Sequence, residues 1–253
     1  MKVKIIAEIG PNHNGKIAQA KKLIKYAKEC GADYVKFQTF VTDEIVTLTA
    51  KKAKYQAEKK VNETQYEMLK KLELNFNQFK ILYDYSKKIK IKFLSTAFDL
   101  KSLKFISLLN PEFIKIPSGE ITNFQLIKAI SLLKKKIILS TGMSNMSEIL
   151  RTYNYIIRNG ISRNMIYVLQ CNTEYPTPFE DVNLNVLKMY KKFFGDNIGY
   201  SDHTLGIEAA IASVSLGAKI IEKHFTLSRK MRGPDHKASS ERAPVKKTIF
   251  FFI

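Results

Sequence analysis

All four histidines of this sequence lie in or just after short apolar segments, and two of them occupy equivalent positions. His203 follows the segment NIGYSD, and His224 ends the next one, AKIIEKH. If these segments are neighbouring parallel strands, both imidazoles lie within reach of one metal ion. The nearby carboxylates of Asp202, Glu222 and Asp235 would orient the rings. The residues predict a metal site with open positions, and two histidines that only line a polar pocket are the alternative.

Lys36 and Lys115 differ from the other lysines in the segments that carry them. Alternation in VKFQ and IKIPS turns both side chains toward the inside of the predicted fold, near its top. Two ammonium groups among several hydrogen-bond donors favour a site for a phosphate or a carboxylate. A Schiff-base aldolase with either lysine as nucleophile is the enzymatic alternative, although clustered hydroxyls suit anion binding better. The neighbouring hydroxyl and amide side chains are Gln38, Thr96, Ser118, Ser140 and Thr141.

Three further residues at strand ends are open to more than one interpretation. Glu8 and Glu120 each carry a carboxylate that accepts a sugar hydroxyl, acts as a general base or pairs with a lysine, and spacing alone does not choose. Cys171 lies where a nucleophile would be useful, but a small buried side chain is the favoured interpretation. Because Cys30 and Cys171 lack metal-type spacing, we expect two reduced thiols.

All these residues follow segments that are typical of β-strands. Eight short apolar strands each end in a polar cluster, and each but the last is followed by a helix, which predicts an α/β fold of the closed (β/α)8 or TIM-barrel type. Active sites of such barrels lie at the C-terminal ends of the strands. The eight strand ends should therefore form one site in one domain. They read AEIGPNHNG, KFQTF, STAFD, KIPSGE, LSTGM, QCNTEYP, YSDHT and EKHFT.

Two regions depart from the alternation of strands and helices. Thr49 to Leu72 is rich in charge and predicts a helical insertion over the barrel mouth, after which Asn75 or Asn77 caps the next helix. The final run, SERAPVKKTIFFFI, contains Pro244 and has no helical period. We therefore expect the eighth barrel helix to be incomplete.

Composition excludes several classes of protein. The 253 residues are 45% hydrophobic and 26% charged, and no apolar run reaches the roughly 18 residues of a membrane span. The net charge of +19 comes mainly from lysines spread over helix faces, with only 6 arginines among 42 basic residues. Nucleic-acid readers depend on arginine forks and aromatic platforms, so we expect no nucleic-acid partner. Without a membrane-length run we expect no membrane partner, and the start MKVKIIAEIG, whose apolar run is brief, favours a cytoplasmic location. A positive field at the mouth would attract small anionic substrates.

The strand-end motifs, with NTEYPTPFED and GPDHKAS after them, resemble the sialic acid synthase family. The resemblance implies condensation of phosphoenolpyruvate with an N-acetylated mannosamine-type aldose, release of phosphate and formation of a nine-carbon 2-keto acid. It makes the chain a C–C bond-forming transferase of nonulosonic acid (sialic or legionaminic acid) biosynthesis. The segment CNTEYPTPFEDVNL is most similar to the branch that makes legionaminic acid, whose acceptor is a 2,4-diacetamido-trideoxymannose.

The resemblance also implies roles for individual residues. His203 and His224 would bind a divalent metal ion, Mn²⁺ or Mg²⁺, and Glu120 would handle protons. The acceptor sugar would be bound by Glu8, Tyr175 and Asp235. Phosphoenolpyruvate would be held by Lys36, Gln38, Thr96, Lys115, Ser118, Ser140 and Ser201.

The resemblance covers residues 1–239, which we expect to form the synthase barrel. Residues 240–253 resemble no part of the family, whose members continue with a small antifreeze-like domain and form homodimers. We expect a chain without that domain to be weakly active or inactive, and a truncated, non-catalytic remnant is the alternative from another class.

Overall fold

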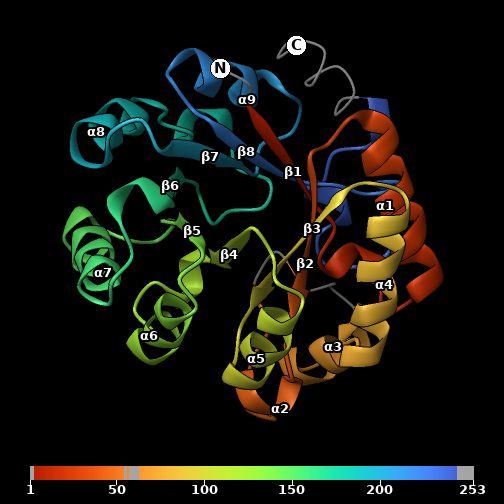
Figure 1. The fold of residues 1–253 in the computed structure, drawn as a ribbon. Coiled ribbons are helices and arrows are strands. Elements are labelled where there is room, and N and C mark those ends of the chain that lie inside the picture. The colour runs from red at the N-terminus through yellow and green to blue at the C-terminus, as the bar shows by residue number, and fades with distance from the viewer. Residues whose placement is uncertain (1–2, 54–55, 57–62, 244–253) are drawn as a thin grey trace.

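The computed structural model describes residues 3–53, 56 and 63–243, and their eight parallel strands form one closed barrel (Figure 1). The strands pair in chain order, and β8 returns to pair with β1 in a register that sets Glu8 opposite His224. The prediction of a TIM barrel is confirmed. The strands are β1 (Lys4–Glu8), β2 (Tyr34–Thr39), β3 (Lys92–Ala97), β4 (Phe113–Ile116), β5 (Lys136–Ser140), β6 (Ile166–Gln170), β7 (Ile198–Asp202) and β8 (Ile220–His224).

Helices surround the barrel and connect consecutive strands, as Figure 1 shows. Local signals set their ends: Gly31 closes the first helix in a left-handed conformation, with φ of 92°. Asn75 begins the helix before β3 with a capping box in which Gln78 is the second partner, which settles the choice between Asn75 and Asn77. The barrel helices are α1 (Ile17–Cys30), α4 (Phe76–Lys88), α5 (Leu100–Leu108), α6 (Phe124–Leu132), α7 (Met146–Arg158), α8 (Asn185–Phe194) and α9 (Glu208–Ser215).

The predicted helix over Thr49–Leu72 is confirmed in its last part and wrong in its first. Residues 65–72 form α3 (Gln65–Leu72), whereas residues 49–53 are not helical, and the short helix α2 (Thr42–Ile45) lies before the predicted segment. Thr64 starts α3 with a capping box, and Glu63 just before it binds Lys52 at 2.9 Å. The capping box begins a new helix rather than continuing one. Residues 54–55 and 57–62 of the predicted helix lie outside the described residues.

The inside of the barrel is divided into two layers. Seven apolar residues, one from each strand except β7, pack together as a plug that closes the lower part of the barrel. On β7 the corresponding position is Gly199, where a Cβ would lie 2.5 Å from the carbonyl oxygen of Ile220 and 3.1 Å from the side chain of Leu169. We call this set the apolar plug: Ile6, Tyr34, Leu94, Phe113, Ile138, Leu169 and Ile220.

Two residues after each plug position, the barrel interior becomes polar. Strand side chains alternate in direction with a period of two, so each of these residues also points inward, one step closer to the mouth. The apolar plug therefore forms the base on which a polar layer stands. This polar layer consists of Glu8, Lys36, Thr96, Lys115, Ser140, Cys171, Ser201 and Glu222.

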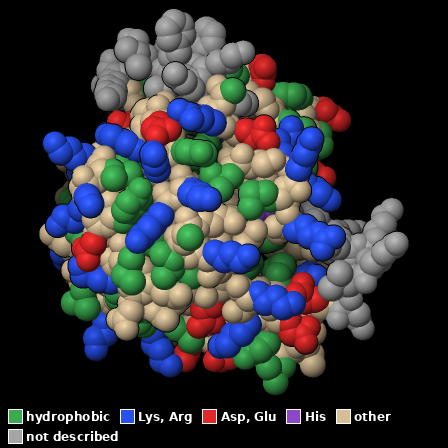
Figure 2. All heavy atoms as spheres, turned by 90° about the vertical axis from the view of Figure 1, so that its right-hand side faces the viewer, with side chains coloured by type: hydrophobic (Ala, Val, Ile, Leu, Met, Phe, Trp, Pro, Cys, Tyr) green, Lys and Arg blue, Asp and Glu red, His purple; other side chains and the backbone are tan. Residues whose placement is uncertain are grey.

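The outer surface in Figure 2 carries many lysine side chains, scattered among apolar and acidic groups. Several of them pair with acids along the same helix, as Lys80 does with Asp84 at 2.6 Å. Among the described residues, no helix is long and apolar enough to cross a membrane. The expected division into residues 1–239 and 240–253 stays a prediction, and residues 244–253 lie outside the described part of the chain.

Candidate active site

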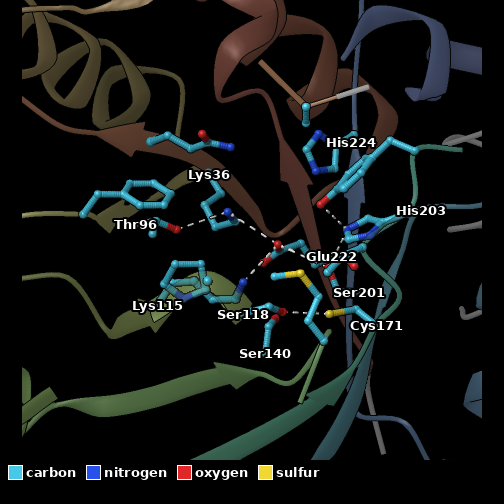
Figure 3. Close-up of a pocket in the computed structure, with 18 residues that line it drawn as sticks. Lys36, Thr96, Lys115, Ser118, Ser140, Cys171, Ser201, His203, Glu222 and His224 are labelled. Carbon is cyan, nitrogen blue, oxygen red and sulfur yellow. Dashed lines mark hydrogen bonds and ion pairs between the residues drawn. The ribbon is translucent and has the colours of Figure 1, made fainter. Parts of the chain in front are cut away.

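A cavity of about 360 Å³ opens above the polar layer, at the C-terminal ends of the strands. Residues from seven of the eight strands or from the loops that follow them line it, as expected for the site of a TIM barrel. Figure 3 shows the lining side chains converging on one space. They are Lys36, Gln38, Ala53, Thr96, Phe98, Lys115, Pro117, Ser118, Gly119, Ser140, Met143, Cys171, Thr173, Tyr175, Ser201, His203, Glu222 and His224.

Two lysines and two carboxylates form a buried cluster at the base of the cavity. Lys36 forms an ion pair with Glu8, and its Nζ lies 3.4 Å from Oε1 of Glu222. The same Oε1 atom lies 3.2 Å from Nζ of Lys115. All four side chains are nearly inaccessible to water. The cluster places two cations within reach of one ligand and balances their charge internally.

The environment shifts the pKa values of this cluster in different directions. Burial lowers the pKa of Lys115. Burial also opposes the charge on Lys36, but Glu222 and Glu8 outweigh it and raise the pKa of that lysine. For Glu222, burial would raise the pKa, but the charges of Lys115 and Lys36 outweigh burial and lower it to about 2. Glu222 is therefore ionised at neutral pH.

The two predicted metal ligands face each other on the other side of the cavity. The ring centroids of His203 and His224 are 5.4 Å apart, and the ring planes meet at 75°. Nδ1 of His203 is hydrogen-bonded to the backbone carbonyl of Asn172, and Nδ1 of His224 lies 3.1 Å from the carboxylate of Asp235. Metal-binding histidines are usually held in this way through the ring nitrogen that does not bind the metal. Nε2 of each ring is the remaining donor atom, and Nε2 of His203 lies 3.2 Å from the hydroxyl of Tyr175 and 3.3 Å from that of Ser201, which a metal ion would displace.

Protonation of the histidine pair differs between the two rings. Burial and the neighbouring His224 lower the pKa of His203 well below its usual value, which keeps that imidazole neutral. Burial also opposes the charge on His224, but Asp235 outweighs it and raises the pKa. The described residues contain no group of three or more His, Cys, Asp or Glu side chains placed to hold a metal. Two imidazoles alone would leave most coordination positions to substrate and water.

Hydroxyl groups complete the wall next to Lys115. Oγ of Ser118 accepts the backbone N–H of Gly142 at 2.8 Å and lies 3.2 Å from Sγ of Cys171. Oγ of Ser140 is buried and has no hydrogen-bond partner among the described residues. A buried hydroxyl without a partner is unfavourable, so Ser140 is well placed to bind a ligand. By contrast, Thr141 points away from the cavity and bonds to the carbonyl of Leu169.

The structure brings ten of the thirteen predicted site residues to the cavity wall. Of the other three, Glu8 lies behind Lys36 and Asp235 lies behind His224, each in contact with that residue. Glu120 is half-buried outside the cavity lining, where its carboxylate accepts a hydrogen bond of 2.8 Å from Asn123. The ten at the wall are Lys36, Gln38, Thr96, Lys115, Ser118, Ser140, Tyr175, Ser201, His203 and His224.

Of the three carboxylates expected to orient the histidines, only Asp235 contacts one of the two rings in the described structure. Glu222 contacts the two lysines instead, and Asp202 points outward and pairs with Lys223 at 2.7 Å. The pairing of Glu222 with the two lysines was therefore not predicted from the sequence. The inward position of Glu222, two residues after Ile220, was the signal that could have revealed it.

Other parts of the cavity wall were also missed. Cys171 does line the cavity, although it is nearly buried as expected. Phe98 and Met143 add apolar surface at the wall, and Ala53 comes from the segment after β2. No simple pattern in the sequence points to these apolar residues, because their side chains carry no reactive group.

The chain is similar to known proteins over nearly all of its length. The chain matches the NeuB family over residues 23–249. It is 50% identical over 246 residues to a protein named N,N'-diacetyllegionaminic acid synthase from Campylobacter jejuni, covering 97% of this chain and 74% of the relative. A protein of the same name from Legionella pneumophila is 42% identical over 249 residues, covering 97% of this chain and 70% of the relative.

Solved structures show the same fold. The crystal structure of an N-acetylneuraminic acid synthetase from Leptospira borgpetersenii, determined with citrate, superposes with a TM-score of 0.88 at 30% identity. The match covers 100% of this chain and 83% of that one. Sequence and structure therefore lead to the same conclusion: this chain belongs to the NeuB family.

Proposed function

We propose that this chain is a nonulosonic acid synthase barrel that condenses phosphoenolpyruvate with an N-acetylated mannosamine-type aldose and releases phosphate. The observation that carries the proposal is one cavity with two buried lysines at its base and two imidazoles 5.4 Å apart on its wall. An anion site and a cation site in one cavity are what joining a phosphorylated acid to a sugar aldehyde requires. The relatives named N,N'-diacetyllegionaminic acid synthase support a diacetamido sugar as the acceptor.

The lysine side of the cavity would bind phosphoenolpyruvate. Nζ of Lys36 and Nζ of Lys115 both face Glu222, so a phosphate or carboxylate beside it would meet two cations. The unpartnered hydroxyl of Ser140 would donate to the same ligand. We assign the remaining contacts to Gln38, Thr96, Ser118 and Ser201, which line the same wall.

A divalent cation, Mn²⁺ or Mg²⁺, fits the histidine side. The fit rests on the chemistry of the donors, since Asn172 and Asp235 hold the Nδ1 atoms and burial keeps His203 neutral. When bound there, the cation acts as a Lewis acid that polarises a carbonyl oxygen. Tyr175 belongs to the same side, because its hydroxyl lies 3.2 Å from Nε2 of His203. We assign Tyr175 to the acceptor sugar, and Glu8 and Asp235 with it, although these two lie behind Lys36 and His224 and would reach a sugar only if those side chains moved.

The proposed reaction forms one C–C bond and one C–O bond to water, and it breaks the C–O bond to phosphate. The enol carbon of phosphoenolpyruvate attacks the aldehyde carbon, and water then adds to the positive centre left behind. The water loses a proton to Glu120, and the alkoxide formed from the aldehyde takes up a proton to become a hydroxyl. The tetrahedral intermediate then expels phosphate, which carries away the proton of the new hydroxyl and leaves a 2-keto acid. Lys36 and Lys115 would stabilise the negative charge on the departing phosphate.

Mass spectrometry of the products tests this proposal. The protein is incubated with phosphoenolpyruvate, Mn²⁺ and either N-acetylmannosamine or the 2,4-diacetamido-trideoxymannose. We expect a nine-carbon 2-keto acid that carries the acceptor's acetamido groups. Recovery of both substrates unchanged from folded protein would overturn the proposal. The expected cytoplasmic location and homodimer belong to the same proposal.

A Schiff-base aldolase is the second candidate, because burial lowers the pKa of Lys115 as such chemistry needs. Against it, Nζ of Lys115 remains 3.2 Å from an ionised carboxylate. Treatment with borohydride in the presence of pyruvate distinguishes the two. We expect no covalent adduct, and an adduct on Lys115 would favour the aldolase.

A further inference from the structure

We propose that Glu222 is an internal counter-anion, which competes with an anionic ligand for Lys36 and Lys115 and so limits how tightly that ligand is held. The ligands concerned are phosphate groups and phosphorylated carboxylic acids. The inference rests on the proposed function for the identity of the anion, whereas the charge cluster itself belongs to the structure.

The contacts of Glu222 are long for an ion pair. A single oxygen, Oε1, lies 3.2 Å from Lys115 and 3.4 Å from Lys36, and it accepts the hydroxyl of Ser201 at 3.4 Å. Charge-assisted N–H···O bonds are usually about 2.7–2.9 Å long. The neighbouring buried pair on the outside of the same strands, Lys223 and Asp202, is 2.7 Å apart. Glu222 therefore faces the lysines without binding either of them closely.

The second oxygen of Glu222 has no partner. Oε2 is buried and makes no hydrogen bond among the described residues, although the side chain lines the cavity. A buried carboxylate that only stabilised the fold would be expected to have both oxygens satisfied, because an unpaired one is costly. Asp202 shows that pattern, since Oδ1 binds Thr204 and Oδ2 binds Lys223. The contrast indicates that Glu222 acts on ligands in the cavity rather than on the stability of the fold.

Charge balance gives Glu222 its effect. Glu8 pairs with Lys36 from behind, so one carboxylate already accompanies that lysine. Among the described residues, the one ion-pair partner of Lys115 is Glu222. Figure 3 shows dashed lines from both lysines meeting at this one carboxylate. Two cations and two anions leave the base of the cavity with no net charge, so an entering anion is attracted by the lysines and repelled by Glu222.

Such a balance suits a reaction that must release phosphate. A site with two unopposed buried lysines would hold inorganic phosphate strongly, since charges removed from bulk water are screened less. The carboxylate lowers that affinity for substrate and product alike. Faster release of phosphate is the expected benefit.

The test is a measurement of anion affinity in the Glu222→Gln variant, which keeps the size of the side chain and removes its charge. The probes are inorganic phosphate and phosphoenolpyruvate, titrated separately by calorimetry. We expect both to bind about tenfold more tightly than to the wild type, because one nearby unit charge is worth at least that factor in a partly shielded site. Phosphate should also become a stronger inhibitor of any turnover.

Glu112→Gln is the matched control. Glu112 pairs with Lys92 and Lys136 at the opposite, N-terminal end of the barrel strands, so this change alters the net charge equally but far from the cavity. Phosphate affinity of the Glu112→Gln variant should equal that of the wild type. If phosphate bound equally more tightly to both variants, the effect would come from net charge and the proposal would be overturned.

The proposal is overturned if folded Glu222→Gln protein binds phosphate as weakly as the wild type, or more weakly. If that variant does not fold, Glu222→Asp replaces it, since the shorter side chain withdraws the carboxylate from both lysines. Its phosphate affinity should then lie above that of the wild type, and an unchanged value would count against the proposal. Tighter phosphate binding by the Glu222→Gln variant would support the role of Glu222 as a counter-anion even if the wild type showed no condensation activity. That absence of activity in the wild type would overturn the proposed function.

Discussion

Nδ1 of His224 lies 3.1 Å from the carboxylate of Asp235, which the chain brings back to the end of β8 through the loop that follows it. Hydrogen bonds from the β1 end hold this loop. The amide of Asn12 donates to the carbonyl of Phe225 at 2.9 Å and to Oγ of Ser239 at 2.8 Å, and Ser239 in turn donates to the carbonyl of Asp235. Hydrogen bonds therefore join the motifs GPNHNG and GPDHKAS beside the imidazole of His224.

Asp235→Asn should weaken Mn²⁺ binding by about 10- to 100-fold, because it removes the negative charge beside Nδ1 and His224 loses basicity. Binding can be measured directly by the electron paramagnetic resonance of free Mn²⁺. His203→Ala and His224→Ala serve as references and should abolish it. If all three folded variants bound Mn²⁺ with wild-type affinity, the two histidines would not be the metal ligands.

Lys115→Ala should weaken phosphoenolpyruvate binding, because it removes one of the two cations at the base of the cavity. Calorimetry of phosphoenolpyruvate measures the loss. Lys80→Ala, which removes an exposed lysine paired with Asp84, is the control and should leave the affinity unchanged. Equal affinities in both variants would place the anion elsewhere.

Glu120→Gln tests the proton role of a residue that the structure places outside the cavity lining. If Glu120 handles protons, turnover should fall by about 10²- to 10⁴-fold while phosphoenolpyruvate binding is retained. Its carboxylate accepts a hydrogen bond from Asn123, so substrate binding would have to release it. Asn123→Ala, which frees the carboxylate, should leave turnover much less affected. A wild-type rate in Glu120→Gln would make Glu120 structural.

The N-terminal end of the barrel should lose stability in acid. Burial would raise the pKa of Glu112, but hydrogen bonds from Lys92 and Tyr34 outweigh it and lower the pKa to about 2. A carboxyl group whose pKa is lower in the folded state stabilises above its unfolded pKa and loses that contribution as pH falls.

The free energy of unfolding, measured by urea titration, should therefore decrease as pH falls from about 4.5 to about 2 by more in the wild type than in Glu112→Gln. Partial exposure of Glu112 reduces the size of the difference without changing its sign. Parallel pH profiles for the two proteins would contradict this role.

Much of the fold could be predicted because the period of two in the strands and the capping residues of the helices are local properties of the sequence. The same alternation that points Ile6 and Tyr34 into the apolar plug points Glu8 and Lys36 into the polar layer. Residues at strand ends then converge because the barrel closes, which is a property of the fold class.

The parts that were missed depend on contacts between distant segments or on single turns. Glu222 contacts Lys115, which is 107 residues away in the chain, and no local sequence pattern predicts such a contact. Glu120 lies in a short 3₁₀ turn, Ser118–Glu120, whose direction leads its side chain to Asn123. The start of α3 at Thr64 was obscured by the charge-rich residues before it, which also suit a helix.

The most direct test of the proposed activity is the release of inorganic phosphate from phosphoenolpyruvate, measured with and without each acetamido sugar, after chelation and after Mn²⁺ is restored. We expect release that requires a sugar, stops on chelation and returns with Mn²⁺, with the diacetamido acceptor preferred. Release that persists without a sugar or after chelation, or no release from folded protein with either sugar, would contradict the assignment of this cavity to metal-dependent condensation.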